Sequence, residues 1–289
     1  MQTRPMQTRP IPASGQPLPV IGVGTWQTFD KPSAERAPLA QVLKVLFEAG
    51  GSVIDSSPMY GAAESVVGEL LAANRVGASE ADKSEAGYNE ASGSAFVATK
   101  VWTRGRDAGV EQMTRSLQLL RRDRIELMQI HNLVDWRVHA PILRDWKAQG
   151  KFRYIGITHY TPSAYAELEA VMRVQAWDFV QLNYALNDRT AEQVLLPLAA
   201  DRGIAVLVNQ PFGGGGLLRS LLSRPLPDWA SESDCASWAQ LLLKFVLARK
   251  EVTCVIPGTA KAEHMADNVA AGVGQMLQAE QVRRLLAVV

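Results

Sequence analysis

Eight short apolar runs, separated by helical patterns, constrain the fold of this chain more than any other feature. The runs are nearly continuously apolar rather than alternating, which is typical of parallel strands buried on both faces. They cover residues 20–26, 52–56, 96–101, 125–131, 154–158, 179–184, 204–208 and 252–257. Amphipathic segments fill most intervals, as in Leu39, Val42, Leu43, Leu46 and Phe47, which follow the helical i, i+3, i+4 spacing. The alternation predicts an α/β protein with one (β/α)8 (TIM) barrel domain over residues 10–289, and an open doubly wound sheet is the alternative.

Length and charge agree with a barrel fold and argue against several classes of binding partner. The chain has 289 residues, which is a normal length for a (β/α)8 barrel. The 30 basic and 29 acidic residues nearly cancel, so we expect no nucleic acid partner and no membrane partner. The start of the chain has no apolar region of a secretory signal, and we expect a cytoplasmic protein with reduced Cys235 and Cys254. No long coiled-coil pattern or large apolar stripe is present, so the expected state is a monomer or a weak dimer.

Three kinds of segment interrupt this pattern. Residues 1–9 precede the first apolar run and are expected to form a flexible N-terminal segment. Residues 74–94 are rich in Ala, Gly, Ser and Glu without an apolar period, which predicts a mobile loop. The segment from Pro211 to Ser233 follows a strand and begins with Gly213 to Gly216, which predicts a loop that closes over a ligand. We expect this loop and a second loop from Trp136 to Pro141 to set substrate choice.

Four polar residues lie where a barrel places its chemistry. Asp55, Lys100 and His131 each end a different apolar run, and Tyr60 follows the first of them. Strand ends of a barrel converge on one face, so these four side chains are expected to meet there. A nearby Lys100 lowers the pKa of a tyrosine, Asp55 offsets the burial of the lysine, and His131 orients a carbonyl oxygen. This group suits hydride transfer, in which a cofactor delivers the hydride and the protein delivers the proton.

Each of the four residues also has an ordinary structural interpretation, and other kinds of site find less support. Taken singly, the aspartate could cap a turn, the lysine could be solvated, the histidine could be a hydrogen-bonded core residue, and the tyrosine could be a turn aromatic.

Gly22-Val23-Gly24 lacks the third glycine of a dinucleotide fingerprint, and the run Gly213 to Gly216 lacks the lysine of a P-loop. The segment Ile256 to Lys261 joins the last strand to a helix and is the better candidate for binding a phosphate. The four histidines lack metal-ligand spacing, and we expect no metal.

Several motifs together carry a family resemblance that extends from about Pro10 to the C-terminus. Gly22 to Trp26 looks like a first strand, and Asp55-Ser56-Ser57-Pro58-Met59-Tyr60-Gly61 with Glu64 and Val67-Gly68 looks like a D-x4-Y…E…VG signature. Ala98 to Trp102 and Ile130-His131 resemble the strands that carry a catalytic lysine and histidine. Gly150 to Ile157 is similar to a GK-(I/V)-R-x-(I/L)-G segment. On these motifs the chain resembles the aldo-keto reductase superfamily, as a bacterial-type member.

The resemblance implies reversible, NAD(P)H-dependent reduction of small aldehydes and ketones. Tyr60 would be the general acid, Lys100 and Asp55 would tune it, and His131 would orient the substrate. The nicotinamide amide would lie against Thr158, His159 and Gln181. Further residues expected to bind the cofactor are Gly24, Thr25, Trp26, Asp55, Asn209, Gln210, Pro211, Phe212 and Gly213. The adenosine phosphate would lie against Pro257, Gly258, Thr259, Lys261, His264 and Asn268.

This chain departs from the family pattern at a few of these positions. Ser-Asn is the commoner pair where Thr158-His159 stands, and many members have an aromatic residue at the position of Asn209. Members that prefer NADP commonly carry two basic groups in the adenosine phosphate site, often with an arginine at the position of His264. Here only Lys261 is permanently charged. We therefore expect NADPH, with NADH or dual use left open.

Three functions of different classes are compatible with these features. In the first, an enzyme reduces small carbonyl compounds in a pocket whose apolar wall is formed by Trp26, Met59 and Trp102, although these residues also fit plain packing at the barrel mouth. In the second, a regulatory or sensor subunit binds the cofactor with little turnover. In the third, a barrel hydrolase or lyase uses Asp55 and His131 without a nucleotide. The reductase explains all of the motifs and is the interpretation that the sequence favours.

Overall fold

The computed structural model describes residues 5–76 and 95–289 of the chain. Residues 1–4 and 77–94 lie outside this part. The loop expected over residues 74–94 therefore lies almost entirely outside the described residues, as does the beginning of the flexible segment expected over residues 1–9.

Eight parallel strands form the barrel, and they confirm the fold predicted from the apolar runs. In chain order they are β3 (Val23–Gly24), β4 (Val53–Asp55), β5 (Phe96–Val101), β6 (Ile125–His131), β7 (Phe152–His159), β8 (Phe179–Asn183), β9 (Ala205–Asn209) and β10 (Val252–Val255). Each strand pairs with the next one along the chain from β3 to β10. Bridges of Ile21 with Val255 and of Gly24 with Gly258 join the last strand to the first segment. The sheet is therefore closed into a barrel rather than open.

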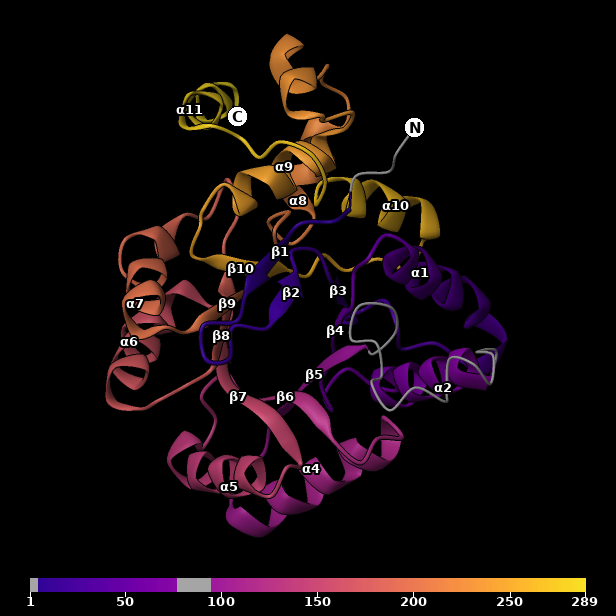
Figure 1. Cartoon of the computed structure of the whole chain (residues 1–289), viewed down its shortest axis with the longest axis vertical. Coiled ribbons are helices and arrows are strands. Elements are labelled where there is room, and N and C mark those ends of the chain that lie inside the picture. The colour runs from indigo at the N-terminus through magenta and orange to yellow at the C-terminus, as the bar shows by residue number, and fades with distance from the viewer. Residues whose placement is uncertain (1–4, 77–94) are drawn as a thin grey trace.

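Helices surround the strands, as Figure 1 shows. They are α1 (Ala37–Glu48), α2 (Ala63–Val76), α4 (Arg106–Leu119), α5 (Trp136–Ala148), α6 (Tyr165–Val174), α7 (Leu195–Arg202), α9 (Trp238–Leu247), α10 (Ala262–Ala270) and α11 (Ala279–Val288). Short 3-10 turns, η1 (Ser33–Glu35), η2 (Pro162–Ala164) and η3 (Thr190–Glu192), precede α1, α6 and α7. The apolar stripe of α1 is buried through Leu39, Val42, Leu43 and Leu46, as its spacing predicted.

Two segments expected to be loops are partly helical. Residues Trp136 to Pro141 form the first turns of α5, so this prediction was wrong. The proline lies inside α5 and the stripe of Ala140, Leu143 and Trp146 is buried, so packing outweighs the cost of the proline. The segment from Pro211 to Ser233 begins as a loop and then contains α8 (Gly216–Leu221) and η4 (Asp228–Ser233).

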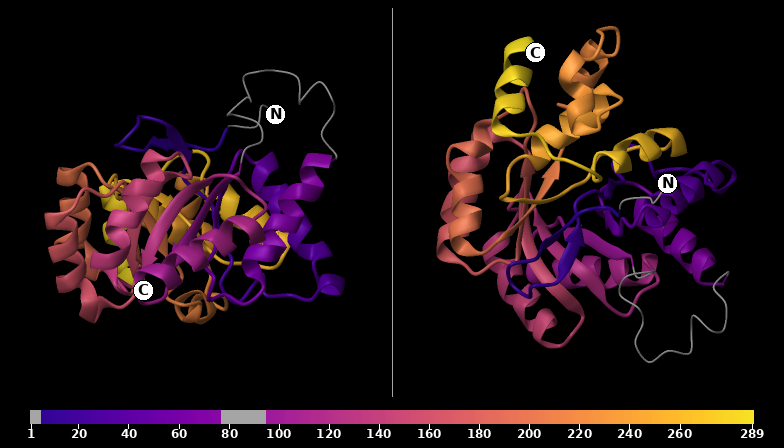
Figure 2. Two further views of the ribbon diagram at one scale, coloured as in Figure 1. Left: turned by 90° about the horizontal axis from the view of Figure 1, so that it is seen from below. Right: turned by 45° about the horizontal axis from the view of Figure 1, so that its top comes forward.

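A small hairpin that the sequence did not predict covers one end of the barrel. Strand β1 (Thr8–Pro10) pairs antiparallel with β2 (Pro17–Pro19), and the left view of Figure 2 shows this hairpin, in indigo, beyond one end of the barrel strands. The Arg9 guanidinium donates hydrogen bonds to the backbone oxygens of Leu247, Arg249 and Val252. Thr8 and Arg9 thus belong to an ordered strand rather than to the flexible segment expected over residues 1–9.

The side chains inside the barrel are apolar at one end and polar at the other. Alternate residues of each strand point inward, so β5 contributes Phe96, Ala98 and Lys100 in order along its length. Near the hairpin, the rings of Phe96, Tyr154 and Phe179 pack with centroids 5.5–6.0 Å apart. Ile11 and Leu18 from the hairpin complete this apolar cluster. The opposite end of the strands carries polar side chains and holds the candidate site.

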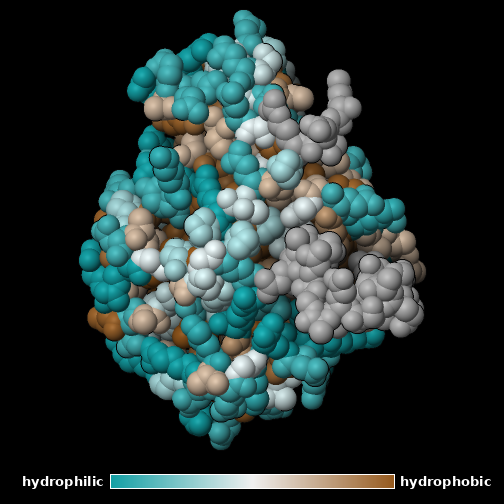
Figure 3. Space-filling view, viewed as in Figure 1, coloured by the Kyte–Doolittle hydropathy of each residue, from teal (hydrophilic) through white to brown (hydrophobic). Residues whose placement is uncertain are grey.

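The outer surface is mostly hydrophilic on the face seen in Figure 3, with smaller hydrophobic areas between the helices. Within residues 5–76 and 95–289, no helix has the length and apolar character required to cross a bilayer.

Candidate active site

A cavity of about 600 Å³ opens at the carboxyl ends of the strands. Its walls come from the segments that follow β3, β4, β5, β6, β7, β9 and β10. Asp55, Tyr60 and His131 line it directly, and Lys100 lies beneath them. A second cavity of about 310 Å³ lies between α9, α11 and the turn at Glu192, and no predicted site residue lines it.

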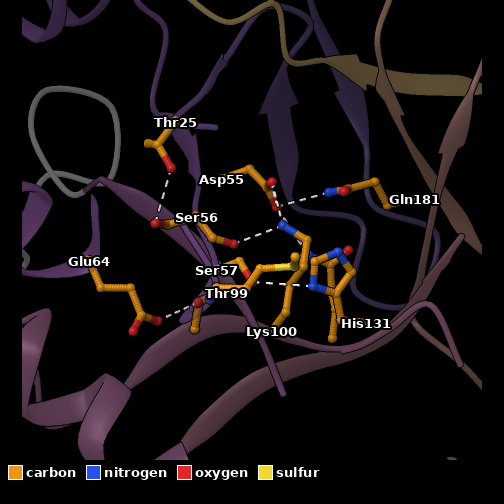
Figure 4. Close-up of polar contacts among 11 residues, drawn as sticks. Thr25, Asp55, Ser56, Ser57, Glu64, Thr99, Lys100, His131 and Gln181 are labelled. Carbon is orange, nitrogen blue, oxygen red and sulfur yellow. Dashed lines mark hydrogen bonds and ion pairs between the residues drawn. The ribbon is translucent and has the colours of Figure 1, made fainter. Parts of the chain in front are cut away.

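Lys100 and Asp55 form a buried ion pair next to the first cavity, and Figure 4 shows the contacts of this pair. Lys100 is 0% exposed, and its Nζ donates hydrogen bonds to Asp55 Oδ2 at 2.6 Å and to the backbone oxygen of Ser56 at 2.7 Å. Asp55 Oδ1 accepts hydrogen bonds from the side-chain amides of Gln129 at 3.1 Å and Gln181 at 2.8 Å. Both carboxylate oxygens are therefore used, which a buried charge requires.

This network keeps Lys100 charged. Burial alone lowers the pKa of Lys100, but Asp55 and Tyr60, through their charges and hydrogen bonds, together raise it by more. The net pKa of Lys100 lies above its ordinary value, so the side chain is an ammonium ion at neutral pH.

Tyr60 lies beside this ammonium ion. A turn in which the Tyr60 N–H donates to the Ser57 backbone oxygen at 3.0 Å carries the side chain back over the barrel. Lys100 Nζ lies 5.1 Å from the centroid of the Tyr60 ring. Burial raises the pKa of Tyr60, and the charge of Lys100 lowers it by a smaller amount. Lys100 thus lowers the pKa of Tyr60, as the sequence predicts, but burial outweighs this effect and the net direction is upward.

His131 ends β6 on the other side of Tyr60, and the two rings meet edge to face with centroids 6.1 Å apart. Its Nδ1 lies 3.2 Å from the hydroxyl oxygen of Ser57. Burial, together with the charge of Lys100, lowers the pKa of His131 to about 3. The imidazole is therefore neutral at physiological pH and carries one N–H.

Most other predicted residues also reach the cavity. Those that line it are Gly24, Thr25, Trp26, Met59, Trp102, Thr158, Gln181, Asn209, Gln210, Pro211, Phe212 and Gly258. Gly213 is not part of the lining, but its neighbours Gly214 and Gly215 are. His159 lies outside the lining, where its ring stacks on Tyr160 and its Nδ1 accepts a hydrogen bond from the backbone N–H of Thr161.

The profile of the aldo/keto reductase family matches residues 20–289, which cover the whole barrel and all the residues of this site. The chain belongs to the aldo/keto reductase family. The resemblance inferred from the sequence is thereby confirmed, and membership makes the protein an oxidoreductase.

Proteins that are similar to this chain are also reductases of this kind. An aldo-keto reductase of Mycolicibacterium smegmatis is 28% identical over 88% of this chain and 84% of its own length. An NADH-specific methylglyoxal reductase of Escherichia coli is 24% identical over 92% of this chain and 93% of its own. A solved aldo-keto reductase of Klebsiella pneumoniae, in complex with NADPH, has a TM-score of 0.76 and 24% identity, and the match covers 98% of this chain and 94% of that one. The last likeness supports the barrel fold.

Some of the residues after β10 line the cavity and others lie outside its lining. Gly258 lines it, whereas Pro257, Thr259, Lys261, His264 and Asn268 do not. Thr259 Oγ1 accepts a hydrogen bond from the Lys261 N–H at 3.1 Å, and Lys261 is the residue before α10. Lys261 and His264 are exposed, whereas Asn268 is buried. Gly258 thus shares the cavity with the catalytic candidates, and the other residues predicted for the adenosine phosphate lie outside its lining.

Several residues of the site were missed by the sequence analysis. Gln129 precedes His131 by two positions on β6, so strand alternation could have placed it in the interior. Ser57, Asn132 and Tyr160 lie in loops, where no periodic pattern indicates direction. Gln27 and Thr28 complete the missed lining, whereas Gly214, Gly215 and Ile256 line the cavity within segments that were predicted to contact a ligand. In the described part of the chain, no three His, Cys, Asp or Glu side chains gather in a way that could hold a metal ion.

The polar wall of the cavity fits a nicotinamide cofactor. Asn132 Oδ1 and Asn209 Oδ1 are buried acceptors without a hydrogen-bond partner among the described residues. A carboxamide supplies the N–H donors that such acceptors require. Asn209 therefore offers a polar contact where many family members have a stacking aromatic ring.

Proposed function

We propose that this protein reduces small, uncharged aldehydes and ketones to alcohols with NADPH. The observation that carries the proposal is the buried pair of Lys100 and Asp55 beside Tyr60, on the wall of a cavity that is large enough for a cofactor ring and a small substrate. The cofactor supplies the hydride that the carbonyl carbon receives.

Tyr60 is the proposed proton donor to the carbonyl oxygen. Its raised pKa keeps the hydroxyl protonated at neutral pH, so the proton is present when the oxygen gains negative charge. The positive charge of Lys100, 5.1 Å from the ring, stabilises the phenolate that remains after transfer. Asp55 keeps that ammonium ion in place through the 2.6 Å hydrogen bond.

His131 is the proposed orienting group. With a pKa of about 3 it stays neutral, so it binds the carbonyl oxygen through an N–H donor and does not compete with Tyr60 as an acid. Two donors, Tyr60 and His131, then converge on one oxygen.

The substrate proposal rests on the lining of the cavity. Trp26, Met59 and Trp102 are 50%, 41% and 42% exposed although all three are large and apolar, and they line the same cavity. Among the described lining residues there is no Arg, Lys or Glu side chain. An apolar wall without a cation favours an uncharged carbonyl compound over a carboxylate-bearing one.

The preference for NADPH is proposed from Lys261, whose exposed ammonium at the start of α10 suits the 2′-phosphate that distinguishes NADPH from NADH. We propose that Pro257, Gly258, Thr259, His264 and Asn268 surround the adenosine end, and that Thr158, His159, Gln181 and Gly213 lie along the rest of the cofactor.

Both cysteines are free and buried, which agrees with the proposed cytoplasmic setting. A monomer or weak dimer remains the proposed state.

Titration of the protein fluorescence with NADPH and with NADH tests the cofactor proposal. We expect tighter binding of NADPH, and Lys261→Ala should weaken NADPH by roughly tenfold and leave NADH unchanged. Binding of neither nucleotide would overturn the proposal. Tight binding with no turnover over a broad panel of aldehydes would instead favour a regulatory or sensor subunit.

A further inference from the structure

A serine that the sequence analysis did not single out makes the only side-chain hydrogen bond recorded for His131 among the described residues. Ser57 lies between Asp55 and Tyr60 in the loop after β4, is fully buried, and places its Oγ 3.2 Å from His131 Nδ1. Figure 4 shows this bond beside the pair of Lys100 and Asp55. The bond joins the loop that carries the proton donor to the strand that carries the orienting histidine.

The direction of this hydrogen bond follows from the single proton of the buried serine hydroxyl. Ser57 Oγ accepts a hydrogen bond from the backbone N–H of Met59 at 3.5 Å, and among the described residues His131 Nδ1 is its only other hydrogen-bond partner. A buried hydroxyl proton requires an acceptor, so the satisfied arrangement has Ser57 donating to His131 Nδ1. Because a neutral imidazole carries one N–H, the proton of His131 must lie on Nε2, across the ring from Ser57.

The tautomer of His131 decides whether the ring nitrogen that faces the cavity can donate a hydrogen bond. His131 lines the cavity, and with Nδ1 turned to Ser57 its other ring nitrogen is the one available there. An Nε2–H donates to a carbonyl oxygen, whereas a bare Nε2 has a lone pair that repels it. We propose that Ser57 is a positioning residue, which holds His131 in the Nε2–H tautomer and so sets how the carbonyl oxygen is bound. The consequence for the carbonyl rests on the proposed function, whereas the tautomer does not.

Nitrogen-15 NMR of histidine-labelled protein without nucleotide tests the tautomer directly. We expect the His131 signal, identified by its loss in His131→Asn, to show the Nε2–H form at neutral pH. Ser57→Ala removes one oxygen and adds no bulk, and it should convert His131 to a mixture of tautomers or to Nδ1–H. Ser57→Thr keeps the hydroxyl and should keep the Nε2–H form. As a matched control, Ser56→Ala removes a neighbouring hydroxyl that bonds with Thr25 and should leave the tautomer unchanged.

Steady-state kinetics of the Ser57 variants are the second test of the proposal. Ser57→Ala should lower kcat for a small aldehyde roughly tenfold with the affinity for NADPH within twofold of the original, and Ser57→Thr should restore most of the rate. An Nδ1–H form in the original protein, or an unchanged Nε2–H form in Ser57→Ala, would overturn the proposal. If no carbonyl compound is reduced by the original protein, the proposed function fails, while the NMR result still decides the role of Ser57.

Discussion

The two ends of the barrel are built from the same strands but are stabilised in different ways. At the end covered by the hairpin, Ile11 and Leu18 pack on an apolar cluster in which burial is the main favourable contribution. At the open end, Lys100, Gln129 and Gln181 converge on Asp55, and each polar group there depends on its partners. A single strand contributes to both ends, because β5 runs from Phe96 at the closed end to Lys100 at the open end. A loss at the closed end should therefore affect stability alone, and a loss at the open end should affect chemistry.

The largest effect is expected for Lys100→Met. This change leaves the Asp55 carboxylate buried without a cation, which costs about 3–5 kcal/mol of unfolding free energy. It also removes the charge beside Tyr60, and kcat should fall by about 10²–10⁴. Urea unfolding and steady-state reduction of an aldehyde measure the two losses.

Lys244→Met provides a matched control for that variant. Lys244 is equally buried, but its Nζ donates to the backbone oxygens of Ser233, Val273 and Gln275 at 2.6–2.9 Å, and none of these residues lines the cavity. Its replacement should lower stability and leave kcat of the folded protein within twofold. An equal fall of kcat in both variants would show that the loss reflects general destabilisation.

Leu18→Ala is the corresponding change at the closed end. The side chain is 1% exposed in the barrel cluster, so its truncation should lower the unfolding free energy by about 2–5 kcal/mol. Because Leu18 packs in the apolar cluster at the closed end and does not line the cavity, kcat and the affinity for NADPH should stay unchanged. A large fall in kcat without a change in stability would contradict the separation of the two ends.

A smaller effect is expected in the pH dependence of stability. The pKa of His131 is about 3 in the folded protein and near 6.5 in an unfolded chain, so the unfolded state binds the additional proton between these values. The contribution of neutral His131 is present above pH 6.5 and is lost as the pH falls toward 3, with a slope of up to about 1.4 kcal/mol per pH unit. His131→Asn should show a shallower loss in urea unfolding over this range, and an identical slope would rule out this assignment.

The positions of the strands and of the catalytic candidates were predictable because both follow from local patterns. Each strand is an apolar run, and Asp55, Lys100 and His131 stand where such runs end. The hairpin was not predictable, because three-residue strands that contain Pro10, Pro17 and Pro19 resemble a loop.

Contacts between distant parts of the chain also could not be predicted from the sequence. Ser57 meets His131 over a separation of 74 residues, and nothing near the serine indicates its partner. The net pKa of Tyr60 depends on how burial and the charge of Lys100 balance, and that balance requires the structure. Trp136 to Pro141 was expected to be a loop, whereas burial of the α5 stripe keeps it helical.

Two tyrosine variants, one at each end, test the central claim most directly. Tyr154 at the closed end bonds through its hydroxyl with Ser14 at 2.7 Å and Gln16 at 3.0 Å, whereas Tyr60 is the proposed proton donor. We predict that Tyr60→Phe lowers kcat by about 10²–10⁴ with NADPH binding and stability retained. Tyr154→Phe should lose about 0.5–1.5 kcal/mol of stability and keep its kcat. Full turnover in Tyr60→Phe would contradict the account.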